Sequence, residues 1–209
     1  MAKTLYGKRA SELKHAVIFG TVFSVLLSIF LFIIVANGFF LLRIEVNRTS
    51  MYPTLKDKDI VYANRYRKAN YGDIVIISGE ESAWIVKRVI GMGGDSVKIE
   101  GGYVYLKKAG EEEFKKLEEK YLAKQGVTPC KLNCSLDVSE TYEVGENEIF
   151  YLGDNRTVSK DSRSEFKNCN KSQIVGVVTE WSVTCKGFNT AVYKFTARLS
   201  EGISRIFGA

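Results

Sequence analysis

Residues 73–106 read DIVIISGEESAWIVKRVIGMGGDSVKIEGGYVYL, and this stretch decides the fold. Apolar and β-branched runs alternate in it with glycines and short polar segments, which is the pattern of strands joined by turns. The turns are expected at Gly91–Asp95 and Glu100–Gly102. The strands are expected at Asp73–Ile77, Trp84–Ile90, Ser96–Ile99 and Tyr103–Leu106. The pattern therefore predicts a mainly β domain with several hairpin or meander connections.

Downstream of this stretch, the sequence predicts two more strands and a short helix. The strands are expected at Glu148–Leu152 and Ile174–Val183. The segment Glu111–Gln125 instead has apolar side chains at helical spacing, namely Phe114, Leu117, Tyr121 and Leu122. We expect this segment to be a surface helix in an insertion between strands.

Residues 188–207 have the periodicity of an amphipathic helix. Their apolar side chains follow steps of three and four residues, at Phe188, Val192, Phe195, Leu199, Ile203 and Ile206. Such a stripe either packs against a domain or lies on a lipid surface. For this C-terminal helix, residues 188–209, the sequence leaves both placements open.

Upstream of the β-rich region, residues 16–42 contain no charged side chain and read AVIFGTVFSVLLSIFLFIIVANGFFLL. As a helix this run would extend roughly 40 Å, more than the roughly 30 Å hydrocarbon core of a bilayer. A cleaved signal peptide is the alternative, since the small residues at 36–38 offer a cut site, but its apolar region would be much shorter. We therefore expect a retained transmembrane anchor.

The composition excludes several classes of site. The chain has 209 residues and one histidine, His15, which precedes the apolar run. A Ser-His-Asp triad, a Cys-His protease site and a His-rich zinc site are therefore excluded from the main domain. The net charge is +6, and residues 1–15 contribute +3 of it, from four Lys or Arg against one Glu. The remainder is too dilute to predict a nucleic-acid partner.

The four cysteines all follow the apolar run, at Cys130, Cys134, Cys169 and Cys185. In an extracytoplasmic domain they suggest up to two disulfides, in one of three connectivities. A four-thiolate zinc site usually has two closely spaced pairs, whereas fifteen residues separate the second pair here. We therefore expect no metal site. Reduced thiols are the further alternative, in an organism that lives without oxygen.

Three segments combine residue types that could do chemistry. Thr49–Leu55 places Ser50 before a proline-stiffened turn. Trp84–Ile90 places Lys87 in an apolar strand, where burial lowers the pKa of an amine and makes it a usable general base. Tyr151–Arg163 leaves a strand as a dense polar loop with a Gly-Asp-Asn turn. Each segment alone is equally compatible with an ordinary turn, edge strand or solvated loop.

Together and in this order, the three segments resemble the signature boxes of the bacterial type I (leader) signal peptidases, the Ser-Lys form. The serine box S-M-x-P-T-L is matched by Ser50–Leu55. The lysine box K-R-V-x-G-x-x-G-D is matched by Lys87–Asp95, and the third box G-D-N-R-x-x-S-x-D-S-R by Gly153–Arg163. The resemblance covers about residues 15–183 and includes the single preceding anchor.

This resemblance implies a serine endopeptidase in which Ser50 is the nucleophile and Lys87 the general base. The chemistry agrees, because a serine hydroxyl needs a neighbouring base and the domain has no histidine to supply one. The endoplasmic-reticulum form has histidine where Lys87 stands, so the lysine indicates the prokaryotic form. The resemblance also assigns supporting roles: Ser159 orients the amine, Asp161 and Arg163 form an ion pair, and Asp154 supports the loop.

The implied fold is a body of coiled antiparallel β-sheets behind one transmembrane helix. The implied substrates are secretory preproteins with small residues at positions −1 and −3, bound as an added strand with side chains in shallow apolar pockets. No cofactor is implied, and the other partner is the lipid bilayer. The pocket walls are expected at Met51, Leu55, Ile85 and Val86.

The resemblance also gives the expected orientation, because the basic residues on the two sides of the apolar run are nearly balanced. The expected divisions are a cytoplasmic N-terminus (1–15), a plasma-membrane anchor (16–42), an extracytoplasmic catalytic domain (43–187) and the C-terminal helix (188–209). Two positions depart from the family pattern. Arg48 replaces a serine that helps to form the oxyanion hole in some members, and Gly93 replaces a common proline.

Two other functions are compatible with the sequence. One is a membrane Ser-Lys protease dedicated to a single partner protein. The other is a catalytically silent, membrane-tethered scaffold that binds preproteins. Absence of Ser50 or Lys87 would favour the scaffold, and both residues are present.

Overall fold

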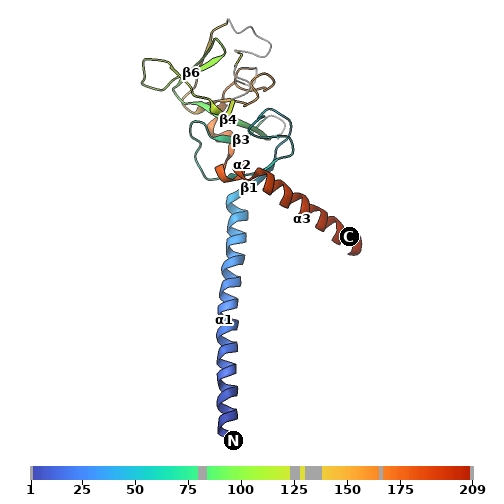
Figure 1. The fold of residues 1–209 in the computed structure, drawn as a ribbon. Helices are drawn as coiled ribbons and strands as arrows, with labels where there is room; N and C mark the ends of the chain where they lie inside the picture. The colour runs from blue at the N-terminus through green and yellow to red at the C-terminus, as the bar shows by residue number, and fades with distance from the viewer. Residues whose placement is uncertain (1, 80–83, 123–127, 130–137, 165–166, 208–209) are drawn as a thin grey trace. The chain divides into compact units, whose positions relative to one another are not determined.

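The computed structural model describes residues 2–79, 84–122, 128–129, 138–164 and 167–207. The chain forms two compact units, residues 1–41 and 42–209. The first unit consists of one long helix, α1 (Ala2–Phe40), shown in blue in Figure 1. Its segment Val17–Phe40 is long and apolar enough to cross a bilayer, and no other helix among the described residues meets that criterion.

The second unit is built on two sheets whose described strand pairings are all antiparallel (Figure 1). The larger sheet has the strand order β1 (Leu41–Glu45), β2 (Ile60–Asn64), β11 (Ile174–Val178), β3 (Ile74–Ser78), β4 (Trp84–Met92), β9 (Glu148–Leu152) and β10 (Cys169–Asn170). The smaller sheet has the order β7 (Lys115–Lys116), β6 (Tyr103–Lys107), β5 (Ser96–Glu100) and β8 (Glu140–Glu143). The mainly β fold predicted from the sequence is therefore confirmed.

Helical structure in this unit is short until the end of the chain. The described residues include two single turns of 3₁₀ helix, η2 (Lys120–Leu122) and η3 (Lys171–Gln173). They are followed by α2 (Glu180–Thr184) and α3 (Lys186–Phe207). The C-terminal helix expected from the periodicity of residues 188–207 is thus present and begins two residues earlier.

The predicted strand Ile174–Val183 is wrong in its second half. The strand β11 ends at Val178, and Thr179 then begins α2 as its N-cap residue. The hydroxyl of Thr179 donates to the carbonyl of Tyr62 in β2, and the Ser182 hydroxyl contacts the same carbonyl. These contacts fold the chain back onto β2, and a simple apolar run could not reveal them.

The helix predicted over Glu111–Gln125 is also wrong within the described residues 111–122. This stretch forms the short strand β7 and the single turn η2. Leu117 packs on the core of the smaller sheet and its N–H donates to Val104, while Leu122 is buried. Contacts with the sheet, rather than turns of a helix, therefore account for the spacing of the apolar residues.

The register of β3 and β4 positions the two basic residues of the lysine box. Lys87 is paired with Val75, and Arg88 with Ile74. Because opposed residues share a face of the sheet, Lys87 and Arg88 lie on opposite faces, as strand alternation predicts. Both side chains are buried, at 4% and 9% exposed, so neither is solvated.

Hydrophobic clusters lie on both faces of the larger sheet. One contains Met51 and Leu55 of the serine box together with Ile74 and Ile76. The cluster on the other face contains Val75, Ile77, Val89 and Tyr151. A third fills the smaller sheet, with Val97, Ile99 and Phe150 among its members. Met51 and Leu55 therefore anchor the serine box in the core, whereas Tyr52 of the same box is exposed.

Candidate functional site

Ser50 and Lys87 are in direct contact. The Nζ atom of Lys87 donates a hydrogen bond to Oγ of Ser50 across 2.9 Å. Lys87 is only 4% exposed, whereas Ser50 is half-buried and reaches the surface. The structure thus brings together the nucleophile and the base that the two boxes predicted, with the base on the inner side.

Burial lowers the pKa of Lys87 from 10.5 to about 8, because an apolar environment penalises the charged ammonium. The carboxylates of Asp161 and Asp154 act in the opposite direction, and the guanidinium of Arg163 lowers the pKa further. The amine is therefore neutral in a useful fraction of molecules near neutral pH, as a general base must be.

The loop that carries Ser50 is held by the third box. The N–H of Asn155 donates to the carbonyl of Ser50 (2.9 Å), and its side-chain amide donates to the carbonyl of Thr49 (3.1 Å). Gly153 lies so close that a Cβ there would overlap Oγ of Ser159 and the carbonyl oxygen of Ser50. Sequence reasoning gave Asn155 and Gly153 no role, although both belong to the Gly-Asp-Asn turn.

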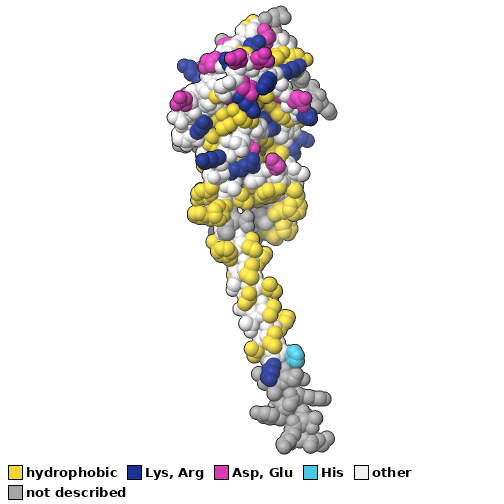
Figure 2. Space-filling view, turned by 90° about the vertical axis from the view of Figure 1, so that its left-hand side faces the viewer, with side chains coloured by type: hydrophobic (Ala, Val, Ile, Leu, Met, Phe, Trp, Pro, Cys, Tyr) yellow, Lys and Arg dark blue, Asp and Glu magenta, His cyan; other side chains and the backbone are white. Residues whose placement is uncertain are grey.

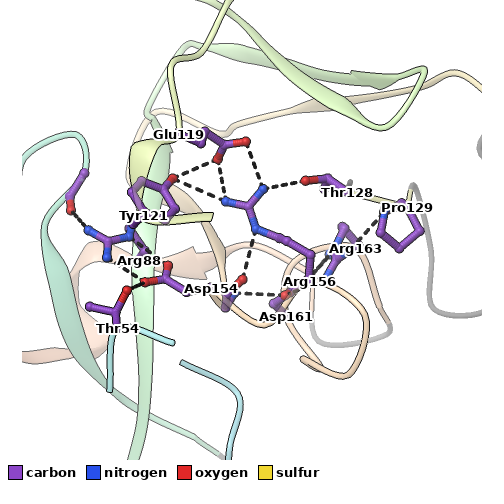
Figure 3. A network of polar contacts seen from close by, with 12 residues as sticks. Thr54, Arg88, Glu119, Tyr121, Thr128, Pro129, Asp154, Arg156, Asp161 and Arg163 are labelled. Atoms are coloured by element: carbon purple, nitrogen blue, oxygen red, sulfur yellow. Dashed lines mark hydrogen bonds and ion pairs between the residues drawn. The ribbon is translucent and has the colours of Figure 1, made fainter. Parts of the chain in front are cut away.

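Asp154 links all three boxes (Figure 3). Its carboxylate is completely buried and accepts hydrogen bonds from Nε and Nη2 of Arg88 at 2.8 and 2.6 Å. The hydroxyl of Thr54, in the serine box, donates to the same carboxylate. Arg88 also donates to the carbonyl of Gly72. Asp154 therefore fixes the serine loop to the strand that carries the base.

Asp161 and Arg163 form the ion pair that the resemblance implied. The guanidinium donates through Nε (2.8 Å) and Nη2 (2.9 Å) to the two carboxylate oxygens, and both side chains are buried. Asp161 also accepts from the N–H of Gly153 (3.0 Å), and Arg163 donates to the carbonyl of Pro129. The pair thus braces the turn beside Ser50.

Ser159 is buried at 1% exposed beside this turn. Its Oγ has no hydrogen-bond partner within the described ranges of the chain. The hydrogen bond expected between Ser159 and the Lys87 amine is therefore not formed here, and the amine donates to Ser50 instead. A buried hydroxyl that lacks a partner is uncommon and can accept or donate when a neighbouring group moves.

Arg156 is a further buried cation, and its contacts were not predicted from the sequence. Its side chain has no exposed surface and donates through both Nη atoms to the carboxylate of Glu119. Nη1 also donates to the hydroxyl of Thr128 (2.7 Å), and Nε to the carbonyl of Gly153 (3.0 Å). The insertion between β6 and β8 is thereby attached to the catalytic loop, as Figure 3 shows.

Tyr121 extends this connection towards the lysine box. Its hydroxyl donates to Glu119 (2.8 Å), and its ring lies 3.9 Å below the guanidinium of Arg88. Both Tyr121 and Glu119 belong to the stretch for which the sequence predicted a surface helix. The periodicity counted Tyr121 among the apolar side chains of that helix and Glu119 among its polar ones, so only the fold reveals that both belong to the site.

The residues expected to wall the substrate pocket do not share one surface. Met51 and Leu55 are completely buried in a core cluster, so they present no surface to a ligand in this conformation. Ile85 and Val86 are half-buried beside Lys87 but point to opposite faces of β4. Only the last two have surface on which a substrate could lie.

The cysteines are not paired as two disulfides. Cys169 is a buried free thiol whose pKa burial raises to about 12, and Cys185 is an exposed free thiol. Of the predicted disulfides, up to two in number, none therefore involves Cys169 or Cys185, while Cys130 and Cys134 lie outside the described residues. Among the residues that the structure describes, no cluster of His, Cys, Asp and Glu is suited to a metal ion.

Comparison with known proteins identifies relatives. The sequence matches the family described as signal peptidase, peptidase S26, over residues 19–182. It is 37% identical over 139 residues to signal peptidase I T of Bacillus subtilis (strain 168), which covers 63% of this chain and 68% of that protein. It is 31% identical over 180 residues to signal peptidase I U of the same organism, covering 84% and 90%. A crystal structure of a signal peptidase I from Enterococcus faecalis V583 is 29% identical and covers 54% of this chain and 98% of that one, with a TM-score of 0.43.

The family match includes the three boxes and the two sheets that bring them together. It also includes most of the apolar segment of α1, whereas α3 lies beyond it. The chain therefore belongs to the signal peptidase family, peptidase S26, and is a type I signal peptidase, a serine endopeptidase.

Proposed function

We propose that this chain removes signal peptides from secretory preproteins by means of a Ser50–Lys87 dyad. Signal-peptide removal is the activity of the family to which the chain belongs. One observation carries the assignment of the dyad: the buried amine of Lys87 lies 2.9 Å from Oγ of Ser50. A serine hydroxyl is activated by an adjacent base, and a neutral lysine can replace the usual histidine.

The proposed reaction has two halves. Neutral Lys87 takes the proton of Ser50, and Oγ attacks the scissile carbonyl carbon. The ammonium then returns the proton to the leaving amine as the peptide bond breaks, which leaves an ester on Ser50. Water attacks this ester while the same amine takes its proton. As the ester bond breaks, the ammonium returns that proton to Oγ of Ser50, and the signal peptide leaves with a free carboxyl group. The unpartnered hydroxyl of Ser159 is the group we propose to hold the lysine amine during these transfers.

The backbone N–H of Ser50 is the proposed donor to the oxyanion of the tetrahedral intermediate. Arg48, at the position of the serine that contributes in some family members, has a left-handed backbone with φ 72°. Its own N–H donates to Asp57 at 2.6 Å and is therefore engaged. We propose that this chain relies on the Ser50 N–H more heavily than relatives with serine at that position.

The proposed substrate is an extended segment with small residues at −1 and −3. Ile85 lies on the same face of β4 as Lys87 and keeps some exposed surface, so it is the proposed contact for those side chains, whereas Val86 lies on the opposite face. The completely buried Met51 and Leu55 are proposed as packing beneath the site. A larger substrate side chain would clash, and such clashes exclude unsuitable precursors.

The proposed cellular arrangement follows the four divisions of the sequence. Residues 1–15 lie in the cytoplasm, 16–42 cross the plasma membrane, 43–187 form the extracytoplasmic catalytic domain and 188–209 the C-terminal helix. The apolar segment Val17–Phe40 supports this arrangement, and the family match includes most of it, from residue 19 onward. A retained anchor is therefore favoured over a cleaved leader.

The test uses the purified full chain in detergent with a secretory precursor at mildly alkaline pH. Cleavage products are identified by mass spectrometry, with Ser50→Ala, Lys87→Ala and the exposed-site control Lys56→Ala in parallel. We expect one cut after a small-x-small site, lost in the first two variants and retained in the third. Cleavage that survives Lys87→Ala would reject the dyad. If no member of a precursor panel is cut, a dedicated-substrate protease or a silent scaffold is the better description.

A further inference from the structure

The helix α3 attaches to the domain through its polar side. The hydroxyl of Thr190 accepts from the N–H of Ile60 at the start of β2 (3.0 Å), and the buried Asn189 donates to the carbonyl of Ser182. Lys186 donates through Nζ to the carbonyl of Thr54. These directional bonds fix the rotation of the helix about its axis, because each needs its side chain to face the domain.

The apolar side of α3 is left without cover from the domain. Within residues 186–201, where side-chain burial is described, four large apolar side chains are 43–72% exposed: Phe188, Val192, Phe195 and Leu199. At 100° per residue they fall within a stripe roughly 60° wide, on roughly the opposite side from Lys186, Thr190 and Tyr193. A surface helix of a soluble domain normally buries its apolar stripe and exposes its polar one. Here the arrangement is reversed, and Figure 1 shows α3 directed away from the sheets.

We propose that α3 lies in the plane of the bilayer surface, with this apolar stripe inserted among the lipids. The proposal rests on the proposed anchoring of the chain by α1. It adds a second attachment, made by a segment beyond the residues that match the family. Helices with one apolar stripe and basic residues on other sides are typical of such interfacial attachment.

The short chain segment between the apolar part of α1 and Arg43 favours lipid as the partner of the apolar stripe of α3. The guanidinium of Arg43 lies 4.5 Å above the ring of Tyr193 in α3. Arg43 is only three residues beyond Phe40, where the apolar segment ends. Three extended residues span about 10 Å, so the middle of α3 is tethered close to any membrane that the segment crosses. A second copy of the chain could cover the stripe only by displacing the lipid that the anchor keeps within this distance.

The charges around the stripe fit the same occupant. Lys194 and Arg198 are exposed on the flank of α3 between the stripe and the docked side. Basic side chains at that level suit the anionic phosphates of a lipid surface. Figure 2 shows both signs of charge interspersed over the upper part of the domain, whereas its lower end in that view is mostly apolar. Exposed apolar surface of this kind marks an interaction site rather than ordinary solvated surface.

The test places a fluorescent reporter on the stripe of the full-length protein. The sequence has two tryptophans, so a Trp84→Phe, Trp181→Phe background removes the native signal. Phe195→Trp then reports from the stripe, and Lys194→Trp is the matched control on the neighbouring flank. Both proteins are reconstituted into vesicles of phosphatidylcholine and phosphatidylglycerol, with and without phosphatidylcholine brominated in its acyl chains.

We expect the Phe195→Trp protein to emit at shorter wavelength and to be quenched several-fold more strongly by brominated lipid than the Lys194→Trp protein. Solvent-like emission from both, with no quenching, would overturn the proposal. Emission at shorter wavelength without quenching by lipid would also overturn it, because protein, such as a second copy, would then cover the stripe.

This readout does not depend on peptidase activity, so failure of the proposed function leaves it interpretable. Extraction of the vesicles with alkaline carbonate tests the anchor separately. A chain that stays in the membrane without quenching at residue 195 refutes the attachment of α3 alone. A chain that carbonate removes refutes the anchor itself.

Discussion

At the level of single residues, we expect the buried amine of Lys87, as the proposed base, to set the pH at which the site reacts. Its pKa of about 8 means that the neutral, reactive form is scarce at pH 6 and dominant at pH 9. We expect kcat/KM for a quenched fluorescent signal-peptide substrate to fall about tenfold for each pH unit below 8 and to level off above 9. The full chain in detergent is assayed from pH 6 to 10. A flat profile, or an acidic optimum, would contradict a lysine base.

The same burial makes Lys87 a stability liability. Its folded pKa lies below its unfolded value, so the unfolded chain binds the extra proton between about pH 8 and 10.5. Lys87→Met should therefore raise the free energy of unfolding at pH 7 by on the order of 3 kcal/mol. The gain should shrink as the pH rises through that window, and thermal unfolding at several pH values measures it. The exposed Lys56→Met is the control, and an equal effect there would exclude burial as the cause.

Gly153 is the residue whose size the site tolerates least. A Cβ at this position would meet Oγ of Ser159 and the carbonyl oxygen of Ser50. We expect Gly153→Ala to displace the serine loop and lower kcat/KM by about a hundredfold, because small misplacements at a reacting centre have large effects. Gly187→Ala is the matched control, since nothing lies within 4 Å of a Cβ there. Equal kcat/KM values for the two variants would show that the serine loop accommodates a Cβ at residue 153 without displacing Ser50.

At the level of elements, the insertion between β6 and β8 works as a brace for the catalytic loop. Removal of the Glu119 carboxylate leaves Arg156 buried without its main counter-charge. We expect Glu119→Ala to lower the free energy of unfolding by about 3–5 kcal/mol, which is typical for one half of a buried ion pair. Glu118→Ala next to it removes an exposed carboxylate and should change stability by less than about 0.5 kcal/mol. Chemical denaturation of the full chain compares the two, and similar losses would mean that the pair contributes little.

The elements also show which parts of the fold can be predicted from sequence patterns. The central strands were predictable, because β3, β4, β5 and β6 alternate with glycine-rich turns. β1 was not, since Leu41 and Leu42 continue the apolar run of α1. The insertion misled the prediction, because spacings of three and four residues also arise when an extended chain packs on a sheet.

The residues of the site likewise divide into those that the sequence predicts and those that only the fold reveals. Ser50 and Lys87 could be predicted because three short motifs in a fixed order restrict the chemistry. Glu119 and Arg156 could not, because charges in a polar loop have no signature until the fold brings the two segments together. The missing bond of Ser159 is likewise a matter of side-chain position, which no pattern encodes.

At the level of the whole molecule, orientation across the membrane is the property with the largest consequences. We expect a membrane-impermeant thiol reagent to label the exposed native Cys185 in intact cells. A Lys8→Cys variant should be labelled at residue 8 only after the membrane is permeabilised, because residues 1–15 are proposed to lie inside. Mass spectrometry of the peptides assigns each label. Labelling at residue 8 but not at 185 in intact cells would invert the proposed topology.

The direct passage from α1 to β1 has a consequence for which precursors can be cut. Phe40 ends the helix and Leu41 begins the first strand, so the two elements follow one another directly in the sequence. Ser50 is ten residues beyond Phe40, which limits its height above an anchoring bilayer to roughly 33 Å. In the proposed arrangement, a precursor has to present its scissile bond within that height. The height of the scissile bond above the membrane would then select among precursors, independently of the side chains at the cut. Extra residues inserted between Phe40 and Leu41 would change the height at which cleavage is possible.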